Sequence, residues 1–305
     1  MSSNSEGLTR EPFTHLMRGA MVTLAWLVVT RFVFELVGMP QEFARFFSAT
    51  AGLFLVAIYV AAVGPLRGGL RKFSQHLLPA FILAAWTEAW IILATIVAAL
   101  LHLTRSHFAK EKDFGDFSHL RFHLLQHTVA IGVLFVVVLL LMAAVHILWR
   151  WPVTVAPGAA LGVFVIMRFW TEAMGLEPLR TAAWSSTTLL LVSAFYLGGV
   201  GARVGLTEAR QLLVPSLVLG WVWRFWVYLA TVFSAAIPFF KTHFFDPSRG
   251  AIPRRLLGAL AGGVVEGFIA GMFLWGIAIW IACATQPGGD DRVRKVAVKA
   301  AVPET

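Results

Sequence analysis

The sequence has little charge and almost no cysteine. Asp, Glu, Lys and Arg make up only 13% of its 305 residues, against about 25% in soluble domains. Hydrophobic residues make up 58%, and the mean hydropathy is +0.77. The single cysteine, Cys283, excludes an internal disulfide, a CxxC redox pair and a cysteine-ligated cluster. The composition therefore predicts an integral membrane protein.

Motifs of soluble enzymes are also missing. The sequence contains no phosphate-binding glycine loop, no dinucleotide fingerprint and no nucleophile next to a catalytic base. The net charge of +9 does not predict nucleic-acid binding, because the basic residues are scattered beside apolar runs instead of forming one basic face. The predicted partner is the lipid bilayer.

Eight apolar segments are long enough to cross a membrane, which requires about 20 helical residues. We therefore predict an all-α polytopic membrane protein with eight transmembrane helices, both termini on one side, a polar tail at 1–16 and a polar, basic tail at 285–305. The predicted spans are 17–38, 46–64, 76–103, 124–148, 153–173, 182–201, 212–237 and 257–284.

The two halves of the chain resemble each other, which predicts two parallel four-helix repeats, at 17–148 and 149–284. Two of the three tyrosines, Tyr59 and Tyr196, fall on equivalent positions. At a shift of 137, Arg31, Phe32, Glu35, Gly38, Ser48, Thr50, Tyr59 and Gly64 match Arg168, Phe169, Glu172, Gly175, Ser185, Thr187, Tyr196 and Gly201. At a shift of 136, Gln75, Pro79, Trp90, Thr95 and His107 match Gln211, Pro215, Trp226, Thr231 and His243.

Basic residues are slightly more frequent on the side of the termini. The positive-inside rule then predicts cytoplasmic termini in a bacterial-type inner membrane.

Several ionisable residues lie inside the predicted spans, where such residues are candidates for function. Arg31 with Glu35, and Arg168 with Glu172, have the spacing of ion pairs along a helix, and a purely structural role is the alternative for them. Glu266 lies among glycines, so we expect it to point into a tight helix contact. The intramembrane candidates are Arg31, Glu35, Glu88, Arg168, Glu172, Arg224 and Glu266, with Tyr59 and Tyr196 as repeat-matched polar candidates.

Glu88 and Arg224 occupy equivalent positions of the two repeats and carry opposite charges. If their helices line the pseudo-twofold axis, the two side chains form an ion pair near the middle of the membrane. The alternative is local pairing, with Arg224 bound to Glu266 or Glu172 and Glu88 bound to Arg31 or Arg168.

Histidines and carboxylates gather between residues 102 and 127. His119, His123 and His127 are four residues apart and therefore share one helix face. Imidazoles at that spacing can bind Zn, Fe or Cu, and the candidate ligands are His107, His119, His123 and His127. The alternative is a set of hydrogen-bonded interfacial histidines, and we predict no cofactor.

These features favour a permease for a small solute or ion, with its pathway between the two repeats. Two alternatives stay open: a non-catalytic membrane scaffold or assembly partner, in a homo-oligomer or a membrane complex, and a metal-dependent membrane enzyme built on the histidines. The sequence assigns no catalytic residue.

Overall fold

The computed structural model describes residues 5–176, 181–206, 208–236, 242–245 and 251–285. These residues form helices, short 3-10 turns and connecting loops, and they contain no strand. The all-helical prediction is therefore confirmed for this part of the chain. The long helices are α1 (Ser5–Leu36), α3 (Ala49–Arg67), α4 (Leu77–Leu100), α5 (Phe117–Leu148), α6 (Val155–Ala173), α8 (Ser186–Arg203), α9 (Ala209–Ala236) and α10 (Ile252–Thr285). The short elements are α2 (Gln41–Ala44), η1 (Arg45–Phe47), η2 (Phe73–His76), η3 (Glu111–Asp113), η4 (Pro152–Thr154) and η5 (Ala182–Trp184).

Among the described residues, seven helical stretches are long and apolar enough to cross a membrane. The predicted span at 182–201 corresponds to α8, whose apolar part, Ser186–Gly201, is shorter than the other seven. The first helix begins at Ser5, well before the predicted position 17, and its apolar stretch is Phe13–Leu36. Residues 286–305 of the predicted basic tail lie outside the described residues.

The chain divides into two compact units. The first comprises Met1–Trp149, Ile166–Trp184 and Phe239–His243, and the second comprises Arg150–Val165, Ser185–Pro238 and Phe244–Thr305. The first unit thus includes two segments that the sequence assigned to the second repeat.

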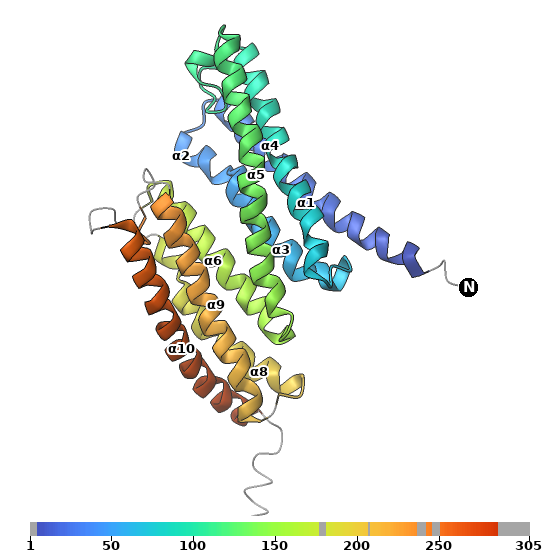
Figure 1. Cartoon of the computed structure of the whole chain (residues 1–305), viewed down its shortest axis with the longest axis vertical. Helices are drawn as coiled ribbons and strands as arrows, with labels where there is room; N and C mark the ends of the chain where they lie inside the picture. The colour runs from blue at the N-terminus through green and yellow to red at the C-terminus, as the bar shows by residue number, and fades with distance from the viewer. Residues whose placement is uncertain (1–4, 177–180, 207, 237–241, 246–250, 286–305) are drawn as a thin grey trace, which may run out of the picture. The chain divides into compact units, whose positions relative to one another are not determined.

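In the first unit, α4 and α5 run side by side, α1 packs on α3 and α4, and α3 packs on α5 (Figure 1). The contacts use small and branched side chains such as Ala57, Ala84 and Val145, which are completely buried. Val129, Val136 and Leu140 of α5 are exposed by more than half. Since lipid is as apolar as these side chains, close packing at the small residues is what holds the helices together.

In the second unit, α10 packs against α8 and α9, and glycines form the contact with α9. A Cβ atom added to Gly220 would lie 2.6 Å from the backbone nitrogen of Gly271, and one added to Gly267 would lie 2.6 Å from Cδ1 of Trp221. Side chains at these positions would push the two helices apart.

The expected position of Glu266 in this glycine contact is wrong. Gly263, Gly267 and Gly271 form a stripe at four-residue spacing that is buried, whereas the side chain of Glu266 is 55% exposed. Glu266 immediately precedes Gly267, so it lies about 100° around the helix from the stripe. Gly258 also lies away from the contact, with no atom within 4 Å of an added Cβ.

Both α1 and α6 end in a Schellman motif, and in each the last turn of the helix contains an acidic residue. The glycines that end them, Gly38 and Gly175, have φ values of +77° and +89°, which glycine adopts without steric cost. Gly38 donates its N–H to the carbonyl of Glu35 at 3.2 Å, and Gly175 donates to that of Glu172 at 2.8 Å. Each chain reversal leaves the carboxylate at the end of a helix, where a loop can reach it.

Candidate functional site

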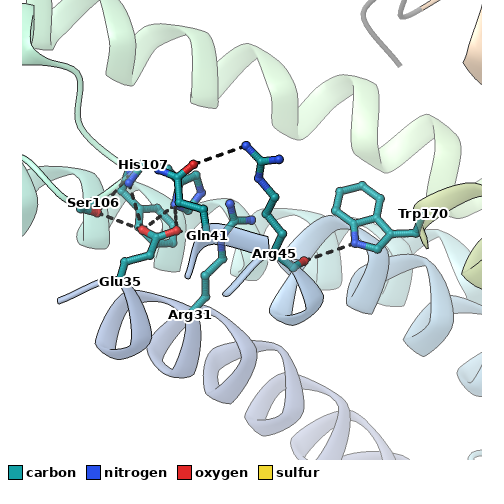
Figure 2. A network of polar contacts seen from close by, with 8 residues as sticks. Arg31, Glu35, Gln41, Arg45, Ser106, His107 and Trp170 are labelled. Atoms are coloured by element: carbon teal, nitrogen blue, oxygen red, sulfur yellow. Dashed lines mark hydrogen bonds and ion pairs between the residues drawn. The ribbon is translucent and has the colours of Figure 1, made fainter. Parts of the chain in front are cut away.

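Glu35 is the centre of a buried hydrogen-bond network in the first unit (Figure 2). It lies at the end of α1, is 4% exposed, and accepts a hydrogen bond from Nε of Arg31, one turn earlier, at 3.2 Å. His107, from the loop after α4, donates its backbone N–H to Oε2 at 2.9 Å and places its Nδ1 2.8 Å from the same oxygen. The Ser106 hydroxyl also donates to Oε2, at 3.4 Å.

This arrangement fixes the orientation of the His107 ring. An ionised carboxylate only accepts hydrogen bonds, so Nδ1 of His107 carries the proton and Nε2 is left as an acceptor. Burial lowers the pKa of His107, the nearby Arg31 and Arg45 lower it further, and Glu35 opposes them without reversing the shift. His107 is therefore a neutral base, and its side chain is 37% exposed.

Glu172, at the end of α6, has the same set of partners. It accepts from Nε of Arg168 at 3.1 Å and from the backbone N–H of His243 at 2.9 Å, and Nδ1 of His243 lies 2.5 Å from its Oε2. The carboxylate is 3% exposed, and the hydroxyl of Thr181 donates to it at 3.1 Å. Two Arg–Glu–His sites of matching geometry therefore occur in the chain.

Arg45 continues the polar network beside Glu35 (Figure 2). Its guanidinium donates to the side-chain oxygen of Gln41 at 3.4 Å, and its carbonyl accepts from the indole of Trp170 at 3.3 Å. Trp170 lies on α6 between Arg168 and Glu172, so this bond connects the surroundings of the two Arg–Glu–His sites.

A third acid, Glu88, lies in the middle of α4 and pairs with His127 of α5. Nδ1 of His127 is 2.8 Å from Oε2 of Glu88, and the residue Glu88 is 4% exposed. Glu88 lies within the apolar stretch Phe73–Leu100, whereas Gln126 and Thr128 flank His127. The pair therefore joins an acid in an apolar helix to an imidazole with polar neighbours.

A cavity of about 570 Å³ in the first unit connects these groups. Its polar lining includes Arg31 and His107 from the Glu35 site and both members of the Glu88–His127 pair. Side chains such as Val28 and Ile91 form apolar parts of the wall. The volume falls within the range of about 300–1,000 Å³ that is usual for small-molecule sites.

Asp113, in η3 before α5, binds two of the histidines. Its Oδ1 lies 2.6 Å from Nδ1 of His119, and its Oδ2 lies 2.8 Å from Nδ1 of His123. Burial opposes ionisation of Asp113, but hydrogen bonds from the Lys110 N–H, His119 and His123 outweigh burial and lower its pKa below the ordinary value. Asp113 is therefore ionised at neutral pH.

The four candidate metal ligands do not converge on one point. Glu35 binds His107, Asp113 binds His119 and His123, and Glu88 binds His127. In the described part of the chain, no three His, Cys, Asp or Glu side chains gather as a bound metal would require. Each of the four histidines therefore takes part in a hydrogen bond with a carboxylate.

Arg224 of α9 pairs with Glu266 of α10 in the second unit, at 2.9 Å between Nη1 and Oε2. Arg224 thus has one of the two local partners considered for it. Glu88 pairs with His127, not with Arg31 or Arg168. Each member of the expected Glu88–Arg224 pair therefore binds a side chain in its own half of the chain.

The repeat-matched tyrosines lie apart from these networks. Tyr59 is 49% exposed and lines a groove of about 850 Å³ with His15 and Arg67, while Tyr196 is half-buried on α8.

Comparison with protein-family models, with curated proteins and with solved structures finds no match for this chain.

Sequence reasoning did not assign His107 and His243 as partners of the two helix-end acids, and it did not identify Asp113 as a bridge between histidines. The sequence did contain a signal for the pairing of His107 and His243 with these acids. His107 and His243 match at nearly the same shift as the Arg–Glu pairs, as expected if the three residues act together.

Proposed function

We propose that the protein is a multi-pass permease for a small polar solute or ion. The cavity beside Arg31, Glu88, His107 and His127 carries this proposal, since it places four ionisable groups in one hollow among membrane-spanning helices. Buried ionisable groups are costly in a bilayer and usually mark a pathway. The Glu88–His127 pair places a carboxyl group and an imidazole where a passing solute can bind them.

We also propose that the chain has eight spans in two parallel four-helix repeats, with α8 as the short sixth span. Local hydrogen bonds that recur at a shift of 136 or 137 support this, besides the two Arg–Glu–His sites. Ser48 and Ser185 accept helix-start N–H bonds from Ala51 and Thr188, both at 3.3 Å. Gln75 and Gln211 accept from Lys72 and Glu208 at 2.7 and 3.0 Å, and Thr95 and Thr231 donate to Ile91 and Val227, both at 2.9 Å.

The proposed orientation has cytoplasmic termini in a bacterial-type inner membrane, from the distribution of basic residues. His107 and the start of α5 then face the outside.

A membrane scaffold is the second candidate, and the Arg–Glu–His sites favour it. Each carboxylate binds an arginine, a backbone N–H and an imidazole, and so ties a loop to the end of a helix. Such saturated networks stabilise structure without a ligand.

Flux through reconstituted protein tests the permease against the scaffold. Liposomes with the full chain are challenged with small anions, cations, zwitterions and neutral polar solutes, and entry is followed by light scattering. We expect faster entry than in protein-free liposomes for at least one class. Ala130→Trp, which fills the cavity from α5, should abolish it, whereas Val136→Trp, on the exposed side of α5, should not. Liposomes as tight as protein-free ones to all four classes would favour the scaffold.

A further inference from the structure

The histidines of α5 form a ladder that leads into the cavity. We use this name for His119, His123 and His127 together with their acids, Asp113 and Glu88. Asp113 binds the first two imidazoles through its two oxygens, and Glu88 binds the third. The rings of His123 and His127 bridge the remaining gap, with centroids 5.2 Å apart.

The ladder runs from the end of a span to its middle. His119 is the third residue of α5, which begins at Phe117, and Glu88 lies near the centre of α4 (Leu77–Leu100). Eight residues separate His119 from His127, which corresponds to about 12 Å along the helix. The ladder therefore covers roughly half of the hydrocarbon thickness of about 30 Å.

Exposure falls along the ladder and then rises at the cavity. The side chains of His119, His123 and His127 are 32%, 11% and 23% exposed. The side chain of Glu88 is 5% exposed. His127 and Glu88 line the cavity, and His119 and His123 do not. His119 is accessible at the membrane surface, and His127 is accessible from the cavity.

We propose that this ladder conducts protons between the aqueous surface at the start of α5 and the Glu88–His127 pair, and that protons are the coupling ion of the permease. The second half of this proposal rests on the proposed function, whereas the conduction path does not.

The proton balance requires no other reactant. An imidazole that accepts a proton on one ring nitrogen releases the proton on its other nitrogen. At rest both imidazoles donate to the ionised Asp113, so transfer requires the tautomer of His123 that carries its proton on Nε2. His119 then gives its Nδ1 proton to Asp113, and the neutral carboxyl group rotates and gives this proton to Nδ1 of His123. One proton enters at His119 and one leaves from His127 or Glu88 into the cavity. No bond other than N–H and O–H bonds changes.

Several polar and charged groups lie beside the path. The Lys110 N–H binds Asp113, Arg121 is exposed on α5, and Arg31 lines the cavity that Glu88 faces. From α1 and the loop after α4, Arg31 and His107 are both held by Glu35. The proton passes from His127 to Glu88, its hydrogen-bond partner, or to the solute.

The described residues of the second half contain no such ladder. Arg224 replaces Glu88 at the equivalent position, its partner Glu266 is a carboxylate, and α10 contains no histidine. An arginine does not release its proton in a protein. Proton transfer is therefore assigned to the first half alone.

Proton uptake by reconstituted protein tests the path. Liposomes that contain the full chain and an internal pH dye are given a membrane potential with valinomycin and potassium. We expect proton entry above that of protein-free liposomes, and a decrease of at least about tenfold in His123→Asn and in Glu88→Gln. Asparagine keeps a donor for Asp113 but cannot relay a proton. The matched control is His102→Asn, on the same side of the membrane but outside the ladder, at a residue whose φ of 52° suits asparagine.

A strictly coupled carrier conducts no protons without its solute, so a second measurement follows Glu88 directly. Its carboxyl infrared band, assigned with Glu88→Gln, should respond to an external pH jump, and His123→Asn should slow the response at least about tenfold. Absence of proton entry together with an unaltered response in His123→Asn would overturn the path. Proton entry without movement of any solute would support the path and contradict the permease. Solute entry that ignores the pH gradient would support the permease and contradict protons as its coupling ion.

Discussion

At the scale of single residues, the account depends on buried carboxylates whose partners are all supplied by the chain. Glu35 and Glu172 hold an arginine on one side and a histidine on the other, and both are almost completely buried. Removing such an acid leaves an unpaired buried cation and an unsatisfied backbone N–H, which costs more than the pair itself contributes.

Glu35→Ala and Glu172→Ala should therefore each lower the free energy of unfolding, by about 3 to 5 kcal/mol. The matched control is Glu208→Ala, which removes an exposed acid paired with Arg210 and should cost less than about 1 kcal/mol. Denaturant unfolding in detergent measures all three. A loss in Glu35→Ala no larger than in Glu208→Ala would show that the Glu35 network contributes little to stability.

The lowered pKa values of His107 and Asp113 predict a stability that falls in two steps with acidification. For His107, the unfolded chain takes up a proton below its ordinary value of 6.5 before the folded protein does, so stability falls from there to the folded pKa. For Asp113, stability is complete above the ordinary value of 3.8 and is lost as pH falls through the lower folded pKa.

Unfolding free energy measured against pH checks this sign. The first step should be smaller in His107→Gln and the second smaller in Asp113→Asn. Stability that increases below pH 6.5 would mean that the folded protein binds the His107 proton more tightly than the unfolded chain does.

At the scale of helices, the glycine contact between α9 and α10 predicts which glycines can be replaced by a larger residue. Gly220→Ala would place Cβ against the backbone of Gly271 and should cost about 1 to 3 kcal/mol. Gly258→Ala has free space and should be neutral or stabilise by up to about 1 kcal/mol through helix propensity. Thermal unfolding compares the two variants, and an equal loss in both would contradict the assigned contact.

The sequence predicted the apolar helices well but placed some of their ends wrongly, because hydropathy detects the part of a helix in lipid and not its polar turns. The span predicted at 124–148 begins at Phe117, since Asp116 caps it by accepting the N–H groups of Ser118 and His119 at 2.9 and 3.1 Å. That polar first turn carries the entry of the histidine ladder.

At the scale of the whole molecule, equivalence between the two halves could be predicted from matched residues, but pairing between helices could not. Glu88 and Arg224 match in sequence, yet Glu88 binds His127 and Arg224 binds Glu266. Which faces of two helices meet depends on packing at small residues, and a shift along the sequence contains no information about it.

Charge exchange distinguishes these local pairs from the expected pair between the halves. Arg224→Glu should impair folding by placing two carboxylates together, and adding Glu266→Arg should restore at least half of the lost stability. Adding Glu88→Arg to Arg224→Glu should restore nothing, because each new charge then faces the wrong local partner. Rescue by Glu88→Arg instead of Glu266→Arg would support the pair between the halves. Thermal unfolding of the single and double variants measures this.

The most direct test of the permease is whether the cavity can be reached from both sides of the membrane. Cys283→Ser gives a cysteine-free chain, to which Ala130→Cys in the cavity wall or Val136→Cys on the exposed side of α5 is added. The account predicts that a membrane-impermeant thiol reagent added on either side of the membrane modifies the Ala130→Cys variant. Reversing the pH gradient should change the rate of this modification from each side. The Val136→Cys variant should stay unmodified. Modification of Ala130→Cys from one side only, under every gradient, would contradict it.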